Sequence, residues 1–358
     1  MNKMLNMRVL MAGHGDCLWI EYGDPKEPRR VLIDAGVHAT FQRLEPMLDA
    51  VRSDGKPSHQ ALILTHVDSD HIAGMLPILA SPTHAAQFAE IWFNGRKHLV
   101  PATTLAALGG VQGEVLTDHI ADRQLAWNST FSNRSIVVED DGPLPEIKLA
   151  DGANMTLLSP GWPQLEKMAE TWDAEIRKAG LKKGVAAEQL TVVPGLEMMG
   201  GQVPDIEALL KTPFIEDDRP ANGSSIALLF TYAGATMLLG ADAHPRILAK
   251  SIKRLTGGLK LKVDAFKLPH HGSRRNVTPE LLALVEANLY IFSSNGAYHG
   301  HPDVDAVARV IHSAPDGATI VFNCRTKFND VWDSASLKKK WKYKTVYGDD
   351  NGVDIELL

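Results

Sequence analysis

The segment LTHVDSDHIAG, residues 64–74, places four potential metal ligands directly after an apolar stretch. Residues 59–66 form a continuous apolar run of strand length, which predicts a buried strand ending at a histidine. Residues 69–81 have the apolar spacing of a helix and begin with a serine, a residue common at helix starts. The segment therefore constrains the chain to a fold in which a buried strand leads into a helix, an α/β order. The four ligands are His66, Asp68, Asp70 and His71.

These four side chains form two pairs. His66 and Asp68 alternate along an extended loop and can point the same way, whereas Asp70 and His71 lie at the helix start. Imidazole and carboxylate groups bind divalent cations at about 2.0 to 2.2 Å, so the corner supplies much of a site for two neighbouring ions. A helix-capping role explains either aspartate singly, but it does not account for the two histidines.

Composition narrows the class of protein. The chain of 358 residues is 44% hydrophobic and 22% charged, with a formal net charge of -6, a balance typical of soluble globular proteins. We expect a cytosolic protein, because the sequence shows neither a long apolar run nor a convincing signal peptide. Two cysteines, Cys17 and Cys324, are too few for a disulfide framework. The acidic balance argues against a nucleic-acid-binding surface that covers the whole protein.

Most predicted strands lie in the N-terminal part and the C-terminal part of the chain, and an insertion separates these two parts. Residues 161–218 are helical at first and then rich in Gly and Pro, and we interpret them as an inserted cap or lid within a single domain, residues 1–358. Its Trp162, Trp172, Met198 and Met199 either line a pocket or belong to a small core. Strands are predicted at residues 7–13, 16–23, 29–36, 59–66, 89–95, 224–234, 235–243, 263–273, 287–296, 317–324 and 343–358, and helices at residues 41–53, 69–81 and 165–183.

Two later strand ends carry further ligand types. Asp242 follows one apolar strand directly, and His270 and His271 follow another. Strand ends at one edge of a sheet are places where distant segments converge on a site. Asp242 can bridge two ions, and one of the adjacent histidines can complete the shell of the second ion. Each residue alone is more often a turn aspartate or a buried structural histidine, so it is the repeated pattern that indicates a site.

The order of these segments resembles the metallo-β-lactamase fold, whose usual signature is HxHxDH followed by a distant Asp and His. The HxDxDH of this chain is closer to the hydrolase domain of ComEC-type DNA-uptake proteins and their soluble relatives. The resemblance implies a four-layer αββα sandwich with a helical insertion, and it covers most of the chain outside residues 96–150 and 161–218. The motifs that carry it are GHGDCLWIEYG, LIDAG, THVDSDH, NGSSIALLFTYAGATMLLGAD, LPHHGS and GHPDVDAV.

The resemblance also implies two divalent metal ions, zinc or manganese. One ion would take the first pair of ligands and the other the second pair, with Asp242 as the bridge. Either of the adjacent histidines would join the second ion, with His271 favoured, and Asp34 would support the floor of the site. The implied metal ligands are His66, Asp68, Asp70, His71, Asp242, His270 and His271.

Two departures from the usual pattern matter. The fold normally supplies a further histidine ligand in mid-chain, which has no GxxH-like match here, and His98, His119 and Asn222 are the candidate substitutes. The aspartate at position 68 also adds a third carboxylate to two divalent ions, which leaves a formal charge of about +1. A less positive site richer in oxygen should favour manganese or mixed occupancy over zinc alone.

These residues predict a metal-dependent hydrolase that uses a dinuclear metal-activated hydroxide. Asp70 and His301 are the candidate catalytic residues, with His301 protonating the leaving oxygen or binding phosphate. Its alternative role is a turn residue before a proline. Ser273, Arg274 and Arg275 are candidate donors to phosphate oxygens, and otherwise form a solvated basic turn.

The expected substrate is a phosphodiester in DNA, RNA or a nucleotide derivative, with no membrane partner. One alternative is a hydrolase of another ester, a thioester or a lactone. A non-catalytic regulatory module that retains the fold is the other, because folds host many functions.

Overall fold

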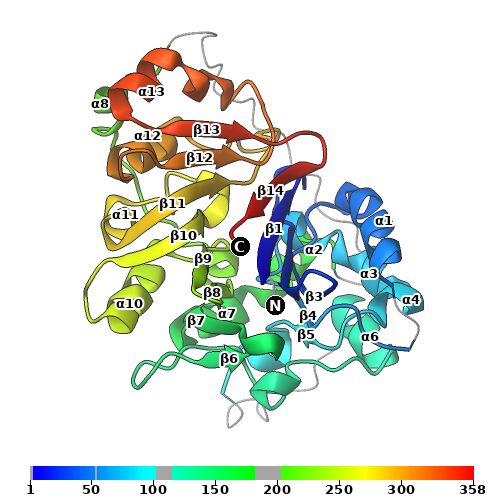
Figure 1. Ribbon diagram of the computed structural model, residues 1–358. Coiled ribbons are helices and arrows are strands. Elements are labelled where there is room, and N and C mark those ends of the chain that lie inside the picture. The colour runs from blue at the N-terminus through cyan, green and yellow to red at the C-terminus, as the bar shows by residue number, and fades with distance from the viewer. Residues whose placement is uncertain (1–2, 53–54, 102–114, 182–202) are drawn as a thin grey trace.

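The computed structural model describes residues 3–52, 55–101, 115–181 and 203–358, which form two β-sheets packed face to face (Figure 1). The strand orders are β14-β1-β2-β3-β4-β5 in the first sheet and β13-β12-β11-β10-β9-β8-β7-β6 in the second. The first sheet comprises β1 (Met4–Leu10), β2 (Leu18–Asp24), β3 (Glu27–Ile33), β4 (Ala61–Ile63), β5 (Ile91–Trp92) and β14 (Gly352–Glu356). The second comprises β6 (Glu146–Lys148), β7 (Asn154–Ser159), β8 (Ala227–Tyr232), β9 (Ala235–Leu239), β10 (Leu261–Lys267), β11 (Val285–Phe292), β12 (Thr319–Phe322) and β13 (Lys344–Tyr347).

Helices cover the outer faces of both sheets (Figure 1). Beside the first sheet lie α1 (Phe41–Val51), α2 (Ser69–Ile72), α3 (Met75–Ala80), α4 (Pro82–Ala85), α6 (Val115–Asp122) and α7 (Trp162–Lys178). Beside the second lie α10 (Pro245–Thr256), α11 (Pro279–Leu284), α12 (Val304–Ser313) and α13 (Ala335–Trp341). The remaining short helices are α8 (Ile206–Leu209) and α9 (Pro220–Gly223). Across the described ranges, no helix is both long and apolar enough to cross a bilayer.

Alternation along the strands separates two apolar cores. In β2, Leu18, Ile20 and Tyr22 point into the core between the sheets, whereas Trp19 packs on the helix side. A strand buried on both faces in this way produces a nearly continuous apolar run in the sequence. The arrangement is helix, sheet, sheet, helix, so the predicted four-layer αββα metallo-β-lactamase fold is confirmed.

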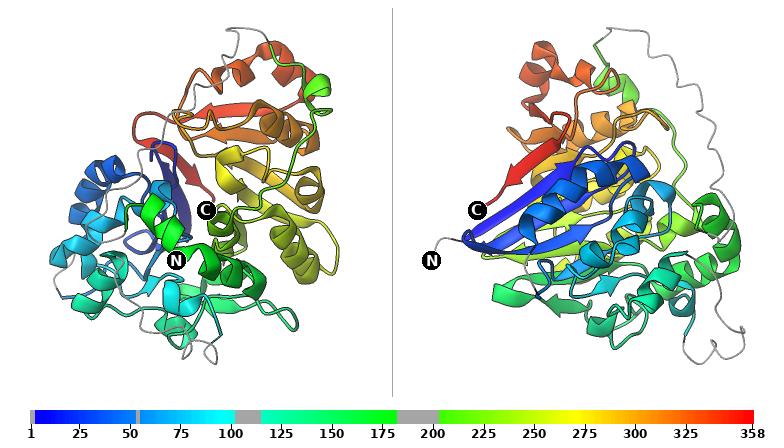
Figure 2. Two further views of the ribbon diagram at one scale, coloured as in Figure 1. Left: turned by 180° about the vertical axis from the view of Figure 1, so that it is seen from behind. Right: turned by 90° about the vertical axis from the view of Figure 1, so that its right-hand side faces the viewer.

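The chain crosses from the first sheet to the second and then returns. β14 pairs antiparallel with β1, and the red C-terminal strand lies beside the blue N-terminal strand in Figures 1 and 2. Across this pair the Arg8 guanidinium bonds both carboxylate oxygens of Asp354, at 2.6 and 2.8 Å. The edge of β1 is therefore covered by a strand from the opposite end of the sequence.

Local details differ from the sequence-based expectation. The helix predicted over residues 69–81 is interrupted between α2 and α3, where an ideal Cβ on Gly74 would lie only 2.0 Å from the carbonyl oxygen of Ala35. This close approach requires glycine. In the predicted insertion, α7 is formed and Trp172 is buried in the first sheet's outer core. Met198 and Met199 lie outside the described residues, and the single-domain organisation with an inserted lid stays a prediction.

We expect Phe230→Ala to destabilise the fold by about 3 to 5 kcal/mol. The Phe230 side chain is fully buried and its ring meets that of Tyr22 across the two sheets, with 5.4 Å between centroids. Urea unfolding measures the change. Leu259→Ala is the control, because Leu259 is 74% exposed and its loss should change stability by less than about 0.5 kcal/mol. Equal effects of the two substitutions would contradict this account of the inter-sheet core.

Candidate metal centre

The ends of strands from both sheets deliver the predicted ligands to one place. His66 follows β4 of the first sheet, and Asp242 follows β9 of the second. His271 lies in a short 3-10 turn directly after β10. Asp16 joins them from the loop between β1 and β2, although the sequence analysis did not select it.

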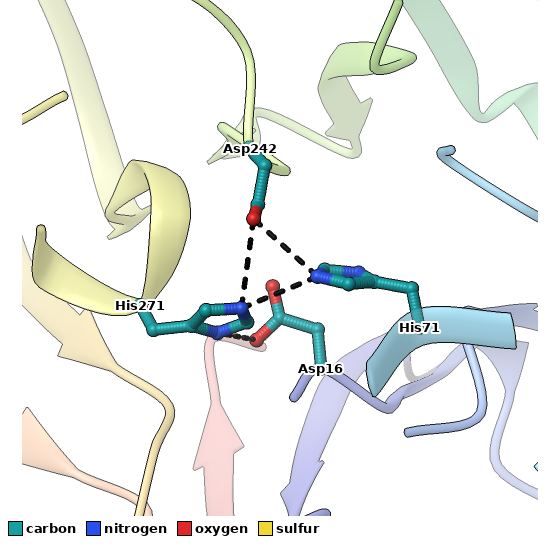
Figure 3. Close-up of side chains that lie close together, drawn as sticks. All are labelled: Asp16, His71, Asp242 and His271. Carbon is teal, nitrogen blue, oxygen red and sulfur yellow. Dashed lines mark hydrogen bonds and ion pairs between the residues drawn. The ribbon is translucent and has the colours of Figure 1, made fainter. Parts of the chain in front are cut away.

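Four buried side chains form the centre of this cluster, as Figure 3 shows: Asp16, His71, Asp242 and His271 each offer a ligand atom, and these atoms lie within 4.8 Å of one another. The Nε2 atoms of His71 and His271 are 3.2 Å apart. Asp242 lies beside both imidazoles, with 3.5 Å from Oδ1 to His71 Nε2 and 3.7 Å from Oδ2 to His271 Nε2. Two imidazoles and two carboxylates aimed at one point form a donor set suited to a divalent cation.

The other predicted ligands border this cluster. Asp70 Oδ2 lies 3.4 Å from His271 Nε2. His66 Nε2 is 3.8 Å from both Asp68 Oδ2 and Asp242 Oδ2. Asp242 thus stands between the two predicted ligand pairs, which is the position expected of a bridging carboxylate.

Asp34 orients the loop that carries the ligands. Its carboxylate accepts bonds from the backbone N–H and the hydroxyl of Thr65, at 2.9 and 2.7 Å, and contacts His71 Nδ1 at 2.7 Å. A proton held on Nδ1 by this carboxylate leaves His71 Nε2 free to face the cluster. This geometry suits the supporting role that the sequence analysis predicted for Asp34.

His271 is oriented by groups from both sheets. Its Nδ1 donates to the Ser293 carbonyl at 3.0 Å and lies 3.2 Å from Asp16 Oδ1. The other oxygen of Asp16 pairs with the Lys267 ammonium at 2.7 Å, and both side chains are buried. Lys267 therefore holds Asp16, which in turn faces His271.

His270 also reaches the cluster. Its Nε2 lies 3.6 Å from Asp242 Oδ2, and its Nδ1 lies 2.9 Å from Asn276 Oδ1 and 3.3 Å from Asn222 Nδ2. The two adjacent histidines thus approach Asp242 from different sides. The structure brings both together with the other predicted ligands.

The charges of the cluster are strongly coupled. Burial disfavours the imidazolium form, but the carboxylates of Asp242, Asp16 and Asp70 together outweigh it and raise the pKa of His271 to about 10. The same balance raises the pKa of His71 well above its usual range. Burial also opposes ionisation of Asp242, yet His271 and His270 hold the pKa of that carboxyl well below its ordinary value. A cation that binds here must therefore displace protons from the imidazoles.

The backbone around the cluster is strained. Asp34, Ala241, His270 and His271 all have positive φ angles, between 46° and 56°, which non-glycine residues rarely adopt. Such conformations cost on the order of 1 to 3 kcal/mol each and gather at functional sites. Close approach adds a further constraint, because an ideal Cβ on Gly15 would lie 1.7 Å from the carbonyl oxygen of Asp70. The β1–β2 loop can therefore meet α2 only with glycine at this position.

Buried atoms without hydrogen-bond partners show that the donors fit a cation. Among the described residues, His66 Nε2 and Asp242 Oδ1 are buried and have no hydrogen bond. A buried polar atom without a partner is costly. A divalent cation bound by His and Asp side chains would satisfy these atoms, so the donor set fits the metal that the sequence predicted.

Of the three candidate substitutes for the mid-chain histidine, the structure connects Asn222 to the cluster. Its side chain contacts His270 and bonds Asp217 Oδ2 at 2.6 Å. His98 is buried with its ring edge to face against Trp127, and His119 on α6 contacts Arg123.

The predicted substrate-binding residues have other neighbours. Arg274 pairs with Asp303 at 3.4 Å, and Arg275 pairs with Asp218 at 3.1 Å. Both arginines line a separate cavity of about 400 Å³. Ser273 is buried beside the histidine pair. Their role toward a substrate stays a prediction.

His301 is buried next to the cluster. Its ring centroid lies 5.5 Å from that of His270, and its Nδ1 lies 3.6 Å from Asp303 Oδ2. Burial, with the nearby charge of His270, holds the pKa of His301 well below its usual range. This environment therefore favours the neutral form of the His301 imidazole.

A cavity of about 300 Å³ opens onto the ligands. Asp68, Asp70, Asp242 and His270 form its base. Its rim is mostly polar and comes from five segments: His14, Ser69, Glu175, Lys178, Ala179, Arg219, Tyr298 and His299. The C-terminal end of α7, within the predicted insertion, thus contributes to the cavity.

Two residues of the site were missed in the sequence analysis. Asp16 lies in the GHGD turn. Lys267 within an apolar strand indicates a carboxylate partner elsewhere in the chain, because a buried ammonium needs one, and that partner is Asp16. Arg219 pairs with Asp68 Oδ2 at 2.8 Å. It follows two aspartates in an otherwise unremarkable loop, and no local pattern marks it.

Comparison with known proteins supports the fold. Residues 11–124 match the family described as Metallo-beta-lactamase superfamily, a stretch that includes the whole THVDSDH segment. No curated protein matches the chain. The Zn²⁺-bound PqqB of Methylobacterium extorquens is similar at 10% identity, with a TM-score of 0.43 over 98% of this chain and 100% of that chain. The metallo-beta-lactamase fold protein YhfI of Bacillus subtilis is similar at 11% identity, with a TM-score of 0.40 over 99% and 100%. The closer resemblance to ComEC-type proteins stays a prediction.

We expect Asp34→Asn to lower the affinity for a divalent cation by about 10- to 100-fold, because His71 loses the carboxylate that orients it. Competition with a chromogenic chelator measures the affinity. The matched control is Asp264→Asn: Asp264 accepts bonds from the backbone N–H and hydroxyl of Thr236, as Asp34 does from Thr65, but it lies in β10. An affinity that falls equally in both variants would attribute the effect to general destabilisation.

Proposed function

We propose that this protein is a metal-dependent hydrolase that cleaves phosphodiester bonds in small nucleotide derivatives or short nucleic-acid ends. The observation that carries the proposal is the convergence of His71, Asp242 and His271 with the HxDxDH loop in one buried cluster. Asp68, Asp70 and Asp242 of this cluster line a cavity. These donors come from both sheets, so they form one preorganised site. The metallo-β-lactamase fold is consistent with hydrolytic chemistry, but the fold alone does not define the reaction.

The residues of the chain would hold the cation and keep its ligands aligned. The donor set is His71, Asp70, Asp242 and His271 on one side, and His66 and Asp68 on the other. Divalent cations at such a site would activate water and stabilise negative charge on the substrate. Asp34 and Asp16 hold the imidazoles with their Nε2 atoms toward the cluster. We propose that His301, which lies next to His270 at the edge of the site, takes part in proton transfer there.

The rim of the cavity favours a phosphate group. Lys178 and Arg219 bring positive charge, although Lys178 also pairs with Glu175 and Arg219 with Asp68. Tyr298 and His299 add groups able to form hydrogen bonds. Charged donors of this kind bind phosphate oxygens strongly. A neutral ester or lactone has no negative charge to pair with these donors, so we favour a phosphodiester as the substrate.

The size of the cavity favours a small substrate. Its volume of about 300 Å³ is at the lower end of the roughly 300 to 1,000 Å³ range for small-molecule pockets. The formal net charge of -6 also weakens long-range attraction to a nucleic-acid duplex. A dinucleotide, a cyclic nucleotide or a strand end fits both observations better than an intact duplex.

We expect hydrolysis of a chromogenic phosphodiester with added manganese or zinc, and a loss of more than about 100-fold in Asp242→Ala and His71→Ala, since direct ligands should matter more than supporting residues. Initial rates with each metal measure the effect. Asp354→Ala is the control, because its carboxylate pairs with Arg8 at the β1–β14 edge. Activity that survives both site substitutions would reject the assignment of the site.

A substrate panel then separates the alternatives. It contains single-stranded DNA, duplex DNA, RNA, linear and cyclic dinucleotides, a carboxylic ester, a thioester and a lactone. Cleavage of only the carboxylic ester, the thioester or the lactone would support a hydrolase and reject the phosphodiester as its substrate. A protein that binds metal but cleaves none of them would support the regulatory module.

A further inference from the structure

The ligand cluster has two halves, one with Asp70, His71, Asp242 and His271 and the other with His66 and Asp68. They differ in the positively charged side chains beside them. Asp70, His71, Asp242 and His271 surround a buried point at which the donors face one another. The nearest ammonium, that of Lys267, reaches this half only through Asp16. Among the described residues, no lysine or arginine forms an ion pair with Asp70 or Asp242 of this half.

In the half that contains His66 and Asp68, an arginine side chain already supplies a positive charge. Arg219 donates from Nη2 to Asp68 Oδ2 at 2.8 Å. The same oxygen is the one that faces His66, with 3.8 Å to Nε2. A metal ion shared by His66 and Asp68 would therefore need the carboxylate oxygen that the guanidinium holds.

A candidate for a further donor is also weak. Asn222, one of the three candidate substitutes for the mid-chain histidine, contacts His270, and its amide nitrogen is committed to Asp217 Oδ2 at 2.6 Å. Its Oδ1 is buried without a hydrogen bond, so the group can offer only a neutral carbonyl oxygen. An amide oxygen is a poorer ligand than an imidazole for zinc-like ions.

The backbone around Arg219 is held at two points. Its own N–H donates to Asp217 Oδ1 at 3.2 Å, and its carbonyl lies 3.0 Å from Nε2 of His244. The side chain is 41% exposed, whereas that of Asp68 is 16% exposed. The guanidinium can therefore leave toward solvent without unfolding the loop.

We propose that Arg219 competes with a metal ion for Asp68, so that the site fills in two steps. One ion binds tightly among Asp70, His71, Asp242 and His271, and a second binds weakly at His66 and Asp68 because it must displace the guanidinium. The inference rests on the proposed function only in that the protein binds divalent cations. It assigns different affinities to the two expected ions: one resident ion and one conditional ion.

Charge balance favours this order. Asp68, Asp70 and Asp242 bring three negative charges to the site. Arg219 balances one of them, and a single divalent ion balances the other two. A second ion adds positive charge that no further carboxylate of the cluster compensates while Arg219 stays in place.

The test is a metal titration of the metal-free full-length protein with Mn²⁺, followed by electron paramagnetic resonance of free and bound ion. The wild-type protein should bind one ion tightly and a second on the order of 10-fold or more weakly, the ratio expected for loss of a charged hydrogen bond. In Arg219→Met the second ion should bind nearly as tightly as the first. The signal of two coupled manganese ions should then appear at lower metal concentration than in the wild type.

Arg8→Met is the matched control. Arg8 also pairs with a carboxylate, Asp354, at 2.6 Å, and its side chain is likewise 41% exposed, but it lies at the β1–β14 edge. Its titration should match the wild type. Arg219→Lys retains the charge and should keep the second ion weak.

The outcomes separate this inference from the proposed function. Two ions of equal affinity in the wild type, or an unchanged titration in Arg219→Met, would overturn the competition while leaving the hydrolase proposal intact. A protein that binds no Mn²⁺ or Zn²⁺ in any variant would reject both. Circular dichroism of the metal-free variants establishes that each is folded.

Discussion

The buried ion pair between Lys267 and Asp16 is the interaction on which the rest of the site depends. Lys267 ends β10 of the second sheet, and Asp16 precedes β2 of the first. An unpaired ammonium at this depth would be strongly destabilising, so the β1–β2 loop must lie against the end of the second sheet. Because one oxygen of Asp16 is held by Lys267, the other faces His271. The contact that joins the sheets also orients a ligand.

Much of the fold was predictable because its signals are local. Alternating and continuous apolar runs mark strands, and the strands that end at His66, Asp242 and the histidine pair were all predicted from such runs. Polar ligand types at the ends of buried strands are also visible in sequence. Boundaries were less accurate, as at α2 and α3, since the interruption there depends on the contact between Gly74 and a distant carbonyl.

The site was only partly predictable because convergence is a tertiary property. Asp16 and Arg219 are far from the ligand loop in sequence, and only packing brings them to it. For the basic residues at positions 274 and 275, the acidic partners were equally invisible in the sequence: acids from other segments pair with both, and their phosphate-binding role stays a prediction. The sequence does not show which of the two adjacent histidines is the metal ligand. In the structure both approach Asp242.

The return of β14 to the first sheet has a consequence for the order in which the protein assembles. Residues 8 and 354, which face each other across β1 and β14, are 346 positions apart in the sequence. During synthesis the free edge of β1 therefore stays open until β14 emerges from the ribosome, and an open strand edge is prone to wrong pairing. The first sheet is completed only when β14 is available, so a nascent chain that stops short of β14 exposes an uncovered strand.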